Sequence, residues 1–498
     1  MKFKDTFRKM AGLLSMGVLA ASALASCGEE STGWDISQVP DDPAPKPAPT
    51  TVKKAPLYWT VYEFCYEAEH FDTDRNMPKA TWEKNLQFVA EQLKPYGYDM
   101  VCTDGFMTMS SDINTDPSGY MTHYGVWSLK ELIAYCSKLG LKVGVYDNPL
   151  WIHGPLDTKV EGTNIPFSNL MYDPGVDKVK NPNAEGDIFQ WVVPSHQGAK
   201  EYIDGFFKYY KNLGVEFIRM DFMCLFEDGG GISDSNPGRG YGRTEYELAL
   251  KYIRESSQKY GVIASIVMPN CFNDAELESQ YGDMFRVDAD TFNGTFAHVN
   301  GLNGSDWVVY DQQTFYRPRG KFSDRWPKAF NMFDGLVAWS HLSGRGKVIL
   351  DADFTRLGTL ASDAEREFCI SLQLMAGAPV AAADQFNSEG IDHNVQFYQN
   401  TEMLALNTDG FVGQPVSDDV TKTDSQIWYG QMTDGSWVVG LFNREETKEI
   451  RSVSLSKLGI SGTKKMRDLW RHTDEGETST VVSAELEPHS CKIIKLTD

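Results

Sequence analysis

The chain has 498 residues, of which 41% are hydrophobic and 12% aromatic, so it can bury a large core and is long enough for more than one domain. This composition excludes a disordered or fibrous protein. The formal net charge of −22 and the pI near 4.9 argue against the cationic surface that nucleic-acid binders present to phosphates, so no nucleic-acid partner is expected, whereas a sugar polymer or oligomer remains compatible.

The first 27 residues have the pattern of a bacterial lipoprotein signal. Basic residues between Lys2 and Lys9 precede an apolar run over residues 10–25. The run ends in Leu24-Ala25-Ser26-Cys27, which resembles a lipobox, whose cysteine is acylated and becomes the first residue of the mature protein. We therefore expect residues 1–27 to be a signal peptide and Cys27 to anchor the protein to the bacterial outer membrane, at the cell surface or on the periplasmic face. An ordinary cleaved signal with an incidental cysteine is the alternative.

Residues 28–55 are rich in proline, aspartate, serine and threonine, which predicts an extended tether. After the tether, one unit recurs: an amphipathic helix, a turn that contains glycine, and a short apolar strand. Ser128 and Glu131 form a plausible capping box at the start of one of these helices. The expected strands lie at residues 58–62, 100–104, 143–147, 215–221, 262–268, 284–288, 348–351 and 379–383.

Strands that are separated by single helices must run parallel, in either an open sheet or a closed barrel. Acidic residues at the strand ends favour the barrel, and no nucleotide-binding glycine motif follows any strand. We expect an α/β fold, with a (β/α)8 TIM barrel over residues 56–396. Alternating segments separated by turns then predict an antiparallel β-sandwich over residues 397–498, with strands at residues 426–431, 437–442, 450–455 and 490–496.

Several of the expected strand ends carry carboxylates, and any one of them could instead be a helix cap or a surface ion pair. Asp221 stands out because it closes an apolar strand and is followed by Phe222 and Met223, which predicts a partly desolvated carboxylate at the barrel mouth. Glycoside hydrolysis needs two such groups, and their separation decides between retention and inversion. The sequence alone leaves that separation open. The acidic candidates are Asp104, Asp147, Asp221, Asp290 and Asp353, with Arg219 and Arg286 alongside.

Ordered motifs over residues 56–498 resemble glycoside hydrolase family 27 of clan D, the α-galactosidases and α-N-acetylgalactosaminidases. Residues 217–221 (FIRMD) look like the nucleophile motif, and residues 286–290 (RVDAD) resemble the acid/base segment, in which an arginine precedes the aspartate by four positions. The resemblance implies that Asp221 is the nucleophile and that Asp290, rather than Asp288, is the acid/base of a retaining hydrolase. Residues 350–358 (LDADFTRLG), 437–443 (WVVGLFN) and 467–470 (RDLW) are similar to later motifs of the family.

The resemblance also implies a carbohydrate substrate and a set of sugar-binding residues. Neither a cofactor nor a metal is expected, because the carboxylates are needed for catalysis and sugar binding, and nothing near His153 or His196 supplies a set of metal ligands. The implied substrate-binding residues are Trp59, Tyr62, Asp104, Tyr146, Arg219, Arg286 and Asp353.

Three departures from the family pattern concern the sugar. The family's pair of adjacent aspartates, which holds O4 and O6, reads Asp104-Gly105 here; its lysine before the nucleophile is Arg219; and residues 268–271 lack a glutamate common in animal members. We expect α-galactoside-like substrates, with a β-L-arabinopyranoside as the alternative because it has no C6 group. A non-catalytic, surface glycan-binding lipoprotein is the alternative from another class.

Overall fold

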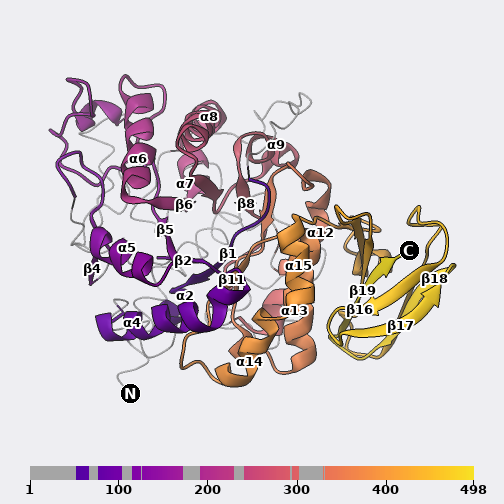
Figure 1. The fold of residues 1–498 in the computed structure, drawn as a ribbon. Helices are drawn as coiled ribbons and strands as arrows, with labels where there is room; N and C mark the ends of the chain where they lie inside the picture. Colours follow the sequence, from indigo (N-terminus) through magenta and orange to yellow (C-terminus); the bar gives the residue numbers. More distant parts are fainter. Residues whose placement is uncertain are drawn as a thin grey trace, which may run out of the picture.

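The computed structural model describes residues 52–66, 77–103, 115–124, 126–171, 191–228, 240–291, 294–301, 329 and 331–498. These residues form an α/β barrel followed by a C-terminal β-sandwich, drawn from indigo to orange and in yellow in Figure 1. The expected fold class is confirmed. Cys27, Asp104 and Gly105 lie outside the described residues. Among the helices that are described, none has the length and apolar character needed to cross a membrane.

The described part of the barrel is one parallel sheet, in the order β10-β11-β1-β2-β5-β6-β7-β8-β9. Strands β9 and β10 are two halves of one stretch, interrupted at Ala352 and Asp353, and they lie at opposite ends of this order, so the sheet closes on itself with eight strands. All eight strands expected from the sequence are present. They are β1 (Leu57–Thr60), β2 (Met100–Cys102), β5 (Lys142–Tyr146), β6 (Val215–Met220), β7 (Ile263–Ile266), β8 (Met284–Arg286), β9 (Ile349–Asp351) with β10 (Phe354–Thr355), and β11 (Val380–Ala382).

Helices connect successive strands and lie around the barrel (Figure 1). The capping box predicted from Ser128 and Glu131 is present, since the Glu131 amide donates to Ser128 Oγ at 3.3 Å and Glu131 Oε2 accepts from the Ser128 amide at 3.4 Å. Each long helix buries one face against the strands. The longer helices are α4 (Lys79–Phe88), α5 (Leu129–Lys138), α6 (Ala199–Leu213), α8 (Gly242–Tyr260) and α13 (Asp363–Ala376).

The sandwich has a six-stranded antiparallel sheet in the order β12-β13-β14-β19-β16-β17, and a two-stranded sheet, β15-β18, packs on one of its faces. Val439 and Leu441 of the larger sheet pack against Val453 and Val482 of the smaller one. The four strands expected here are confirmed as β13, β14, β15 and β19. The strands are β12 (Gln414–Pro415), β13 (Ile427–Gln431), β14 (Trp437–Phe442), β15 (Glu449–Ser454), β16 (Lys464–Asp468), β17 (Thr473–Thr478), β18 (Val481–Leu486) and β19 (Cys491–Thr497).

The change from helices to strands comes later than residue 397, where we expected it. Residue 397 falls inside α14 (Ile391–Tyr398), and α15 (Thr401–Asp409) follows before β12 begins at Gln414. The side chain of Asn400 caps α15, because it accepts from the amides of Glu402 and Met403. This capped helix packs against α13 of the barrel.

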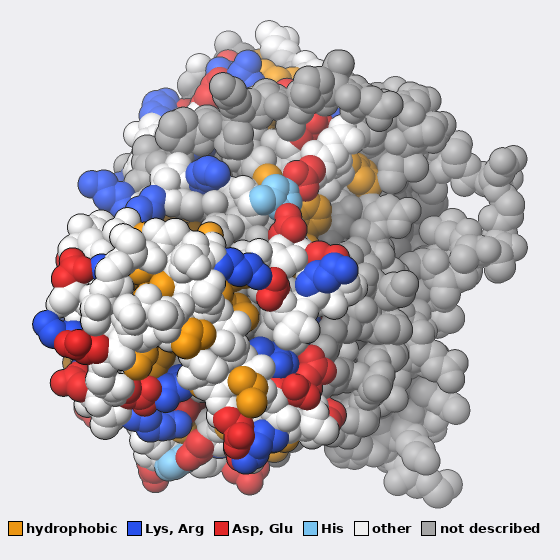
Figure 2. Space-filling model, turned by 90° about the vertical axis from the view of Figure 1, so that its right-hand side faces the viewer, with side chains coloured by type: hydrophobic (Ala, Val, Ile, Leu, Met, Phe, Trp, Pro, Cys, Tyr) orange, Lys and Arg blue, Asp and Glu red, His pale blue; other side chains and the backbone are white. Residues whose placement is uncertain are grey.

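A buried arginine joins the sandwich to the barrel. Arg444 lies 2.8 Å from Asp334, donates to Asn300 Oδ1 at 2.7 Å, and places its guanidinium 4.0 Å from the ring centre of Phe333. On the outer side of the sandwich, acidic and basic side chains are interspersed (Figure 2), as on a solvated surface. The sandwich therefore packs one side against the barrel and exposes a polar side.

Candidate active site

The site lies at the carboxyl-terminal ends of neighbouring barrel strands, where the active sites of such barrels are built. Tyr146 ends β5, Asp221 follows β6, Asp290 follows β8, and Asp353 lies in the break between β9 and β10. The structure therefore brings the two expected catalytic carboxylates together with the tyrosine and aspartate from the neighbouring strands.

Asp221 is held in one orientation by protein donors. The Tyr146 hydroxyl donates to Oδ2 at 2.8 Å, and the Phe222 amide donates to Oδ1 at 2.7 Å. Phe222 adopts a left-handed backbone conformation, with φ at 62°, and Asn148 donates to the Asp221 carbonyl at 2.9 Å. Burial raises the pKa of Asp221 above its ordinary value, although Arg286 and the Tyr146 hydroxyl oppose that change. An oriented, partly desolvated carboxylate of this kind suits nucleophilic attack.

Asp290 has the electrostatic environment of a general acid. Its carboxylate is bound by Arg286 and is 19% exposed. Burial raises the pKa of Asp290 to about 6; Asp353 and Asp221 add to the rise, and Arg286 opposes it. A carboxyl group with this pKa can hold a proton near neutral pH and give it to a leaving group. Asp288 is fully buried and faces His298 instead, which agrees with the choice of Asp290.

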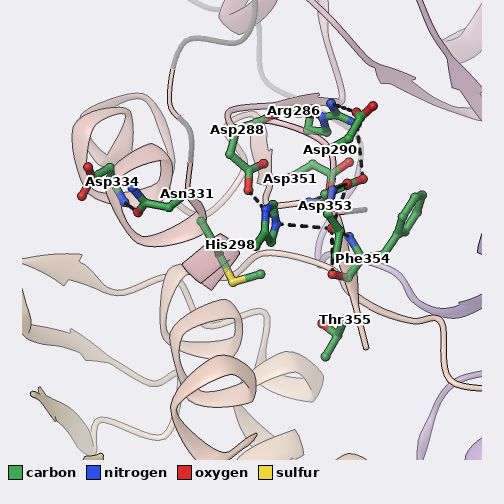
Figure 3. A network of polar contacts seen from close by, with 12 residues as sticks. Arg286, Asp288, Asp290, His298, Asn331, Asp334, Asp351, Asp353, Phe354 and Thr355 are labelled. Atoms are coloured by element: carbon green, nitrogen blue, oxygen red, sulfur yellow. Dashed lines mark hydrogen bonds and ion pairs between the residues drawn. The ribbon is translucent and has the colours of Figure 1, made fainter. Parts of the chain in front are cut away.

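Two buried arginines, Arg219 and Arg286, and two buried aspartates, Asp351 and Asp353, form a network beside Asp290; Figure 3 labels Arg286 and both aspartates. Arg219, which is 1% exposed, donates to Asp351 and to Asp353, each at 2.7 Å, and Arg286 donates to Asp353 at 3.3 Å. Burial alone would raise the pKa of Asp353, but Arg286 and Arg219 hold it below its ordinary value. Because both ends of the Arg219 fork bind aspartates, this side chain positions Asp353; sugar contacts from Arg219, Arg286 and Asp353 stay predictions.

Tyr62 and Trp59, the two aromatic residues expected to bind sugar at the start of the barrel, lie in different surroundings. The ring of Tyr62, in α2 (Tyr62–Tyr66), packs 4.1 Å from the ring of Phe354, beside the network. Trp59 is fully buried in the barrel wall, where its indole N–H donates to the Asp384 carbonyl at 2.8 Å. The sugar contact of Trp59 stays a prediction.

Asp147 is an acidic strand end that does not join the site. It is fully buried, accepts from the Tyr210 hydroxyl at 2.5 Å, and lies 2.8 Å from His153 Nε2. These contacts connect the end of β5 to α6. Asp147 therefore has a structural role.

Sequence reasoning missed several residues of the network. Asp351 was missed, although it forms with Asp353 the same Asp-Ala-Asp pattern as Asp288 and Asp290, and this repeat was a usable signal. Nothing in the sequence pointed to Thr291, His298 or Asn148. An aromatic wall beside Asp221 was also missed: the ring of Trp151 lies 6.1 to 6.4 Å from the rings of Tyr146, Trp191 and Phe222.

Metal ligands do not gather in the described ranges, where no three histidine, cysteine, aspartate or glutamate side chains are grouped to hold an ion. Of the cysteines in these ranges, Cys102, Cys136, Cys224, Cys271 and Cys369 are buried, and Cys491 is half-buried. The acidic groups of the site are instead bound by arginines, hydroxyls and amides, an arrangement that serves proton transfer and nucleophilic attack.

Comparison with known proteins identifies relatives along most of the chain. Residues 422–496 match the alpha galactosidase C-terminal beta sandwich domain. The isomalto-dextranase of Arthrobacter globiformis is 34% identical over 466 residues, which cover 89% of this chain and 67% of that protein. The alpha-galactosidase of Cyamopsis tetragonoloba is 31% identical over 128 residues, which cover 25% of this chain and 29% of that protein.

Solved structures extend the similarity to the whole fold. The Arthrobacter globiformis isomalto-dextranase complexed with panose has a TM-score of 0.78 and 32% identity, covering 91% of this chain and 75% of that chain. A family 27 β-L-arabinopyranosidase from Geobacillus stearothermophilus has a TM-score of 0.65 and 20% identity, and the match covers 90% of this chain and 97% of that chain. The expectation of a retaining glycoside hydrolase that acts on oligosaccharides is confirmed, and the chain belongs to glycoside hydrolase family 27.

Proposed function

We propose that this enzyme hydrolyses α-1,6-linked glucans of the dextran type. The observation that carries the proposal is the extent of the similarity: the isomalto-dextranase matches 89% of the chain, whereas the curated alpha-galactosidases match between 20% and 36% of it. The specificity of a glycosidase depends on side chains from many strand ends, so a relative that matches along all of them is the better guide.

In the proposed reaction, Asp221 attacks the anomeric carbon while Asp290 gives its proton to the departing glycosidic oxygen. The bond from carbon to that oxygen breaks as the bond to Asp221 forms. Asp290, now a carboxylate, takes a proton from water, and the resulting hydroxide displaces Asp221 with overall retention. Tyr146 and the Phe222 amide support this role for Asp221, because they fix the direction of its carboxylate.

Gly105 supports an α-1,6-linked substrate. In the family pattern a second aspartate at this position holds the free O6 hydroxyl of the sugar, and here that ligand is a glycine. In an α-1,6-glucan the O6 atom of an internal glucose carries the next sugar, so there is no free hydroxyl to bind and a further sugar must fit. A glycine meets both conditions, because it has no carboxylate and takes little space.

A comparison of aryl glycosides tests this proposal. We expect the kcat/KM for an aryl α-isomaltoside to exceed that for an aryl α-galactoside and an aryl β-L-arabinopyranoside. Gly105→Asp should lower the isomaltoside to galactoside ratio by up to one or two powers of ten, if a hydrogen bond of about 1 to 3 kcal/mol to the galactoside O6 is gained in the transition state. If the wild type instead prefers the galactoside, the substrate class expected from the sequence is supported. If it prefers the arabinopyranoside, the alternative substrate is supported.

We also propose that the protein is exported and held at the outer membrane by a lipid on Cys27, on the strength of the lipobox. The acyl chains on a single lipoprotein cysteine provide the several hydrophobic anchors that stable attachment needs. Cys27→Ser should move the protein from the membrane fraction to the soluble fraction, measured by fractionation and immunoblotting. Cys65→Ser is the matched control and should stay with the membrane; a Cys27→Ser protein that also stays there would contradict the proposal.

A further inference from the structure

Asp288 lies two residues before the proposed acid/base, and a buried histidine, His298, faces Asp288. Asp288, just after β8, is 0% exposed, and His298, in α10 (Phe296–Asn300), is 1% exposed. Nε2 of His298 lies 3.4 Å from Oδ2 of Asp288, and within the described residues no hydrogen bond reaches that carboxylate. Figure 3 shows the two side chains facing each other. Burial of two ionisable groups is costly, yet the proposed reaction uses neither of them.

Thr291 connects this pair to Asp353. Its hydroxyl oxygen lies 3.3 Å from His298 Nε2 and 2.9 Å from Asp353 Oδ2, and its amide donates to the same Oδ2 at 2.7 Å. A hydroxyl has one proton, and a carboxylate is its strongest nearby acceptor, so we assign that proton to the bond with Asp353. The oxygen then faces His298 as an acceptor. The histidine proton is therefore placed on Nε2, between Thr291 and Asp288.

Asp353 in turn connects Thr291 to Asp290 through Arg286. Asp353 has a left-handed backbone, with φ at 63°, which a non-glycine residue keeps only when its surroundings hold it. Its Oδ1 accepts from Arg286, and the other end of that guanidinium binds Asp290. The charge of Arg286 is thus shared between two aspartates. If Asp353 loses a donor, it draws more of this charge, and the potential at Asp290 becomes more negative.

We propose that Asp288 and His298 position the acid/base of this enzyme. His298 keeps the Thr291 hydroxyl turned toward Asp353, and Asp288 keeps the histidine proton on Nε2. Asp353 then leaves Arg286 available to Asp290. Asp288, His298 and Thr291 are positioning residues, since they act through Asp353 and Arg286. The proposal rests on Asp290 being the acid/base of the proposed function.

The charged groups around both ends of this chain of contacts come from three barrel strands. Asp290 faces Arg286, Asp353 and Asp221. Asp288 and His298 face Arg286 and Asp353. Asp351 also lies near Asp288, and Asp290 repels Asp288 more weakly. Arg219, in β6, binds Asp351 and Asp353 and so connects β6 to this network. A change in the donors to Asp353 therefore acts on Asp290 mainly through Arg286 and through the charge of Asp353 itself.

The first test is Thr291→Val, with Thr291→Ser as its matched control. Valine keeps the shape and the amide but removes the hydroxyl donor. We expect the basic limb of the kcat/KM profile for a phenyl glycoside to move to higher pH by roughly half a unit, because the less neutralised Asp353 raises the pKa of Asp290. Thr291→Ser should keep the wild-type limb. A merely structural role would lower Tm and leave the limb in place, and that result in a folded, active Thr291→Val would overturn the proposal.

Replacements of the pair separate positioning from a direct effect of charge. His298→Leu should move the limb in the same direction as Thr291→Val, whereas His298→Gln, which keeps an N–H near the place of Nε2, should not. Asp288→Asn should also keep the wild-type limb, because the amide oxygen still faces Nε2 of His298. A limb that moves to lower pH in Asp288→Asn would overturn the proposal, since it would show that the charge of Asp288 acts on Asp290 directly.

A measurement without substrate keeps this inference separate from the proposed function. The pKa of Asp290 can be followed by the carboxyl ¹³C shift of aspartate-labelled protein, with the signal assigned by its loss in Asp290→Asn. Thr291→Val should raise this pKa whatever sugar the enzyme cleaves. An unchanged pKa would overturn the positioning role, while failure on every aryl glycoside would count against the proposed function alone.

Discussion

Asp221→Asn is expected to abolish turnover, with a fall in kcat of about 10⁴-fold or more, the scale at which hydrolases lose activity when the nucleophile is removed. Asparagine is nearly isosteric with aspartate, and its carbonyl oxygen can still accept from the Tyr146 hydroxyl or the Phe222 amide. It cannot attack the anomeric carbon, so no covalent intermediate forms. The measurement is kcat on the aryl glycoside that wild type cleaves best, with Tm taken on the same protein.

Asp147→Asn is the matched control for Asp221→Asn, because Asp147 also follows a barrel strand but binds Tyr210 and His153. We expect this variant to lose stability, since a buried carboxylate bound by Tyr210, His153 and the Asn148 amide is replaced, and to keep most of its activity once folded. If Asp221→Asn keeps kcat within tenfold of wild type, the nucleophile is another group. If Asp147→Asn is folded but equally inactive, loss of activity at Asp221 does not identify the nucleophile.

The barrel could be predicted from the sequence because its strands and helices have regular hydrophobic patterns. Residues 215–220, for example, are largely apolar and are preceded by the glycine turn that ends α6. Several strand ends then supplied carboxylates, which located Asp221 and Asp290 at one edge of the sheet. Pattern and position were enough to place these residues, because the strands are buried on both faces, whereas the choice of Asp290 over Asp288 and both catalytic roles came from the resemblance to family 27.

Elements without such patterns were missed. Strand β17 (Thr473–Thr478) has exposed or half-buried side chains throughout, so no alternation marks it. Helix α15 has a cap at Asn400 and a glycine, Gly410, after its last turn. It is too short to show a clear helical period, and we had assigned its residues to the strand region. The Asp288 and His298 pair could not be found either, because its partners are brought together by tertiary packing across a connection, and sequence spacing does not report such contacts.

Asp290→Ala is expected to lower kcat/KM on a glucan or an alkyl glycoside by about 10² to 10⁴, the usual contribution of a general acid. A leaving group that is a poor acid must be protonated as it departs, and alanine has no proton to give. With a dinitrophenyl glycoside the loss in kcat/KM should be small, because this leaving group departs as an anion. The covalent intermediate then accumulates, since alanine also cannot activate water.

The pH dependence of the wild type has a definite sign. Asp290 must be protonated to act as the acid, so kcat/KM on a poor leaving group should fall as the pH rises through about 6, the pKa to which burial raises this carboxyl. On the acid side, Asp221 must lose its proton to attack, and the raised pKa of Asp221 sets that limb. In Asp290→Ala the basic limb should disappear, while the acid limb should remain.

Azide provides the final check on Asp290→Ala. It is a small anion that needs no base, so it should attack the accumulated intermediate and restore turnover of the dinitrophenyl glycoside, giving a glycosyl azide of retained configuration, identified by NMR. Asp288→Asn is the control: Asp288 is buried against His298, so this variant should show neither rescue nor loss of the basic limb. If azide leaves Asp290→Ala unchanged while rescuing Asp288→Asn, the acid/base is Asp288 and the four-residue spacing from Arg286 misled the assignment.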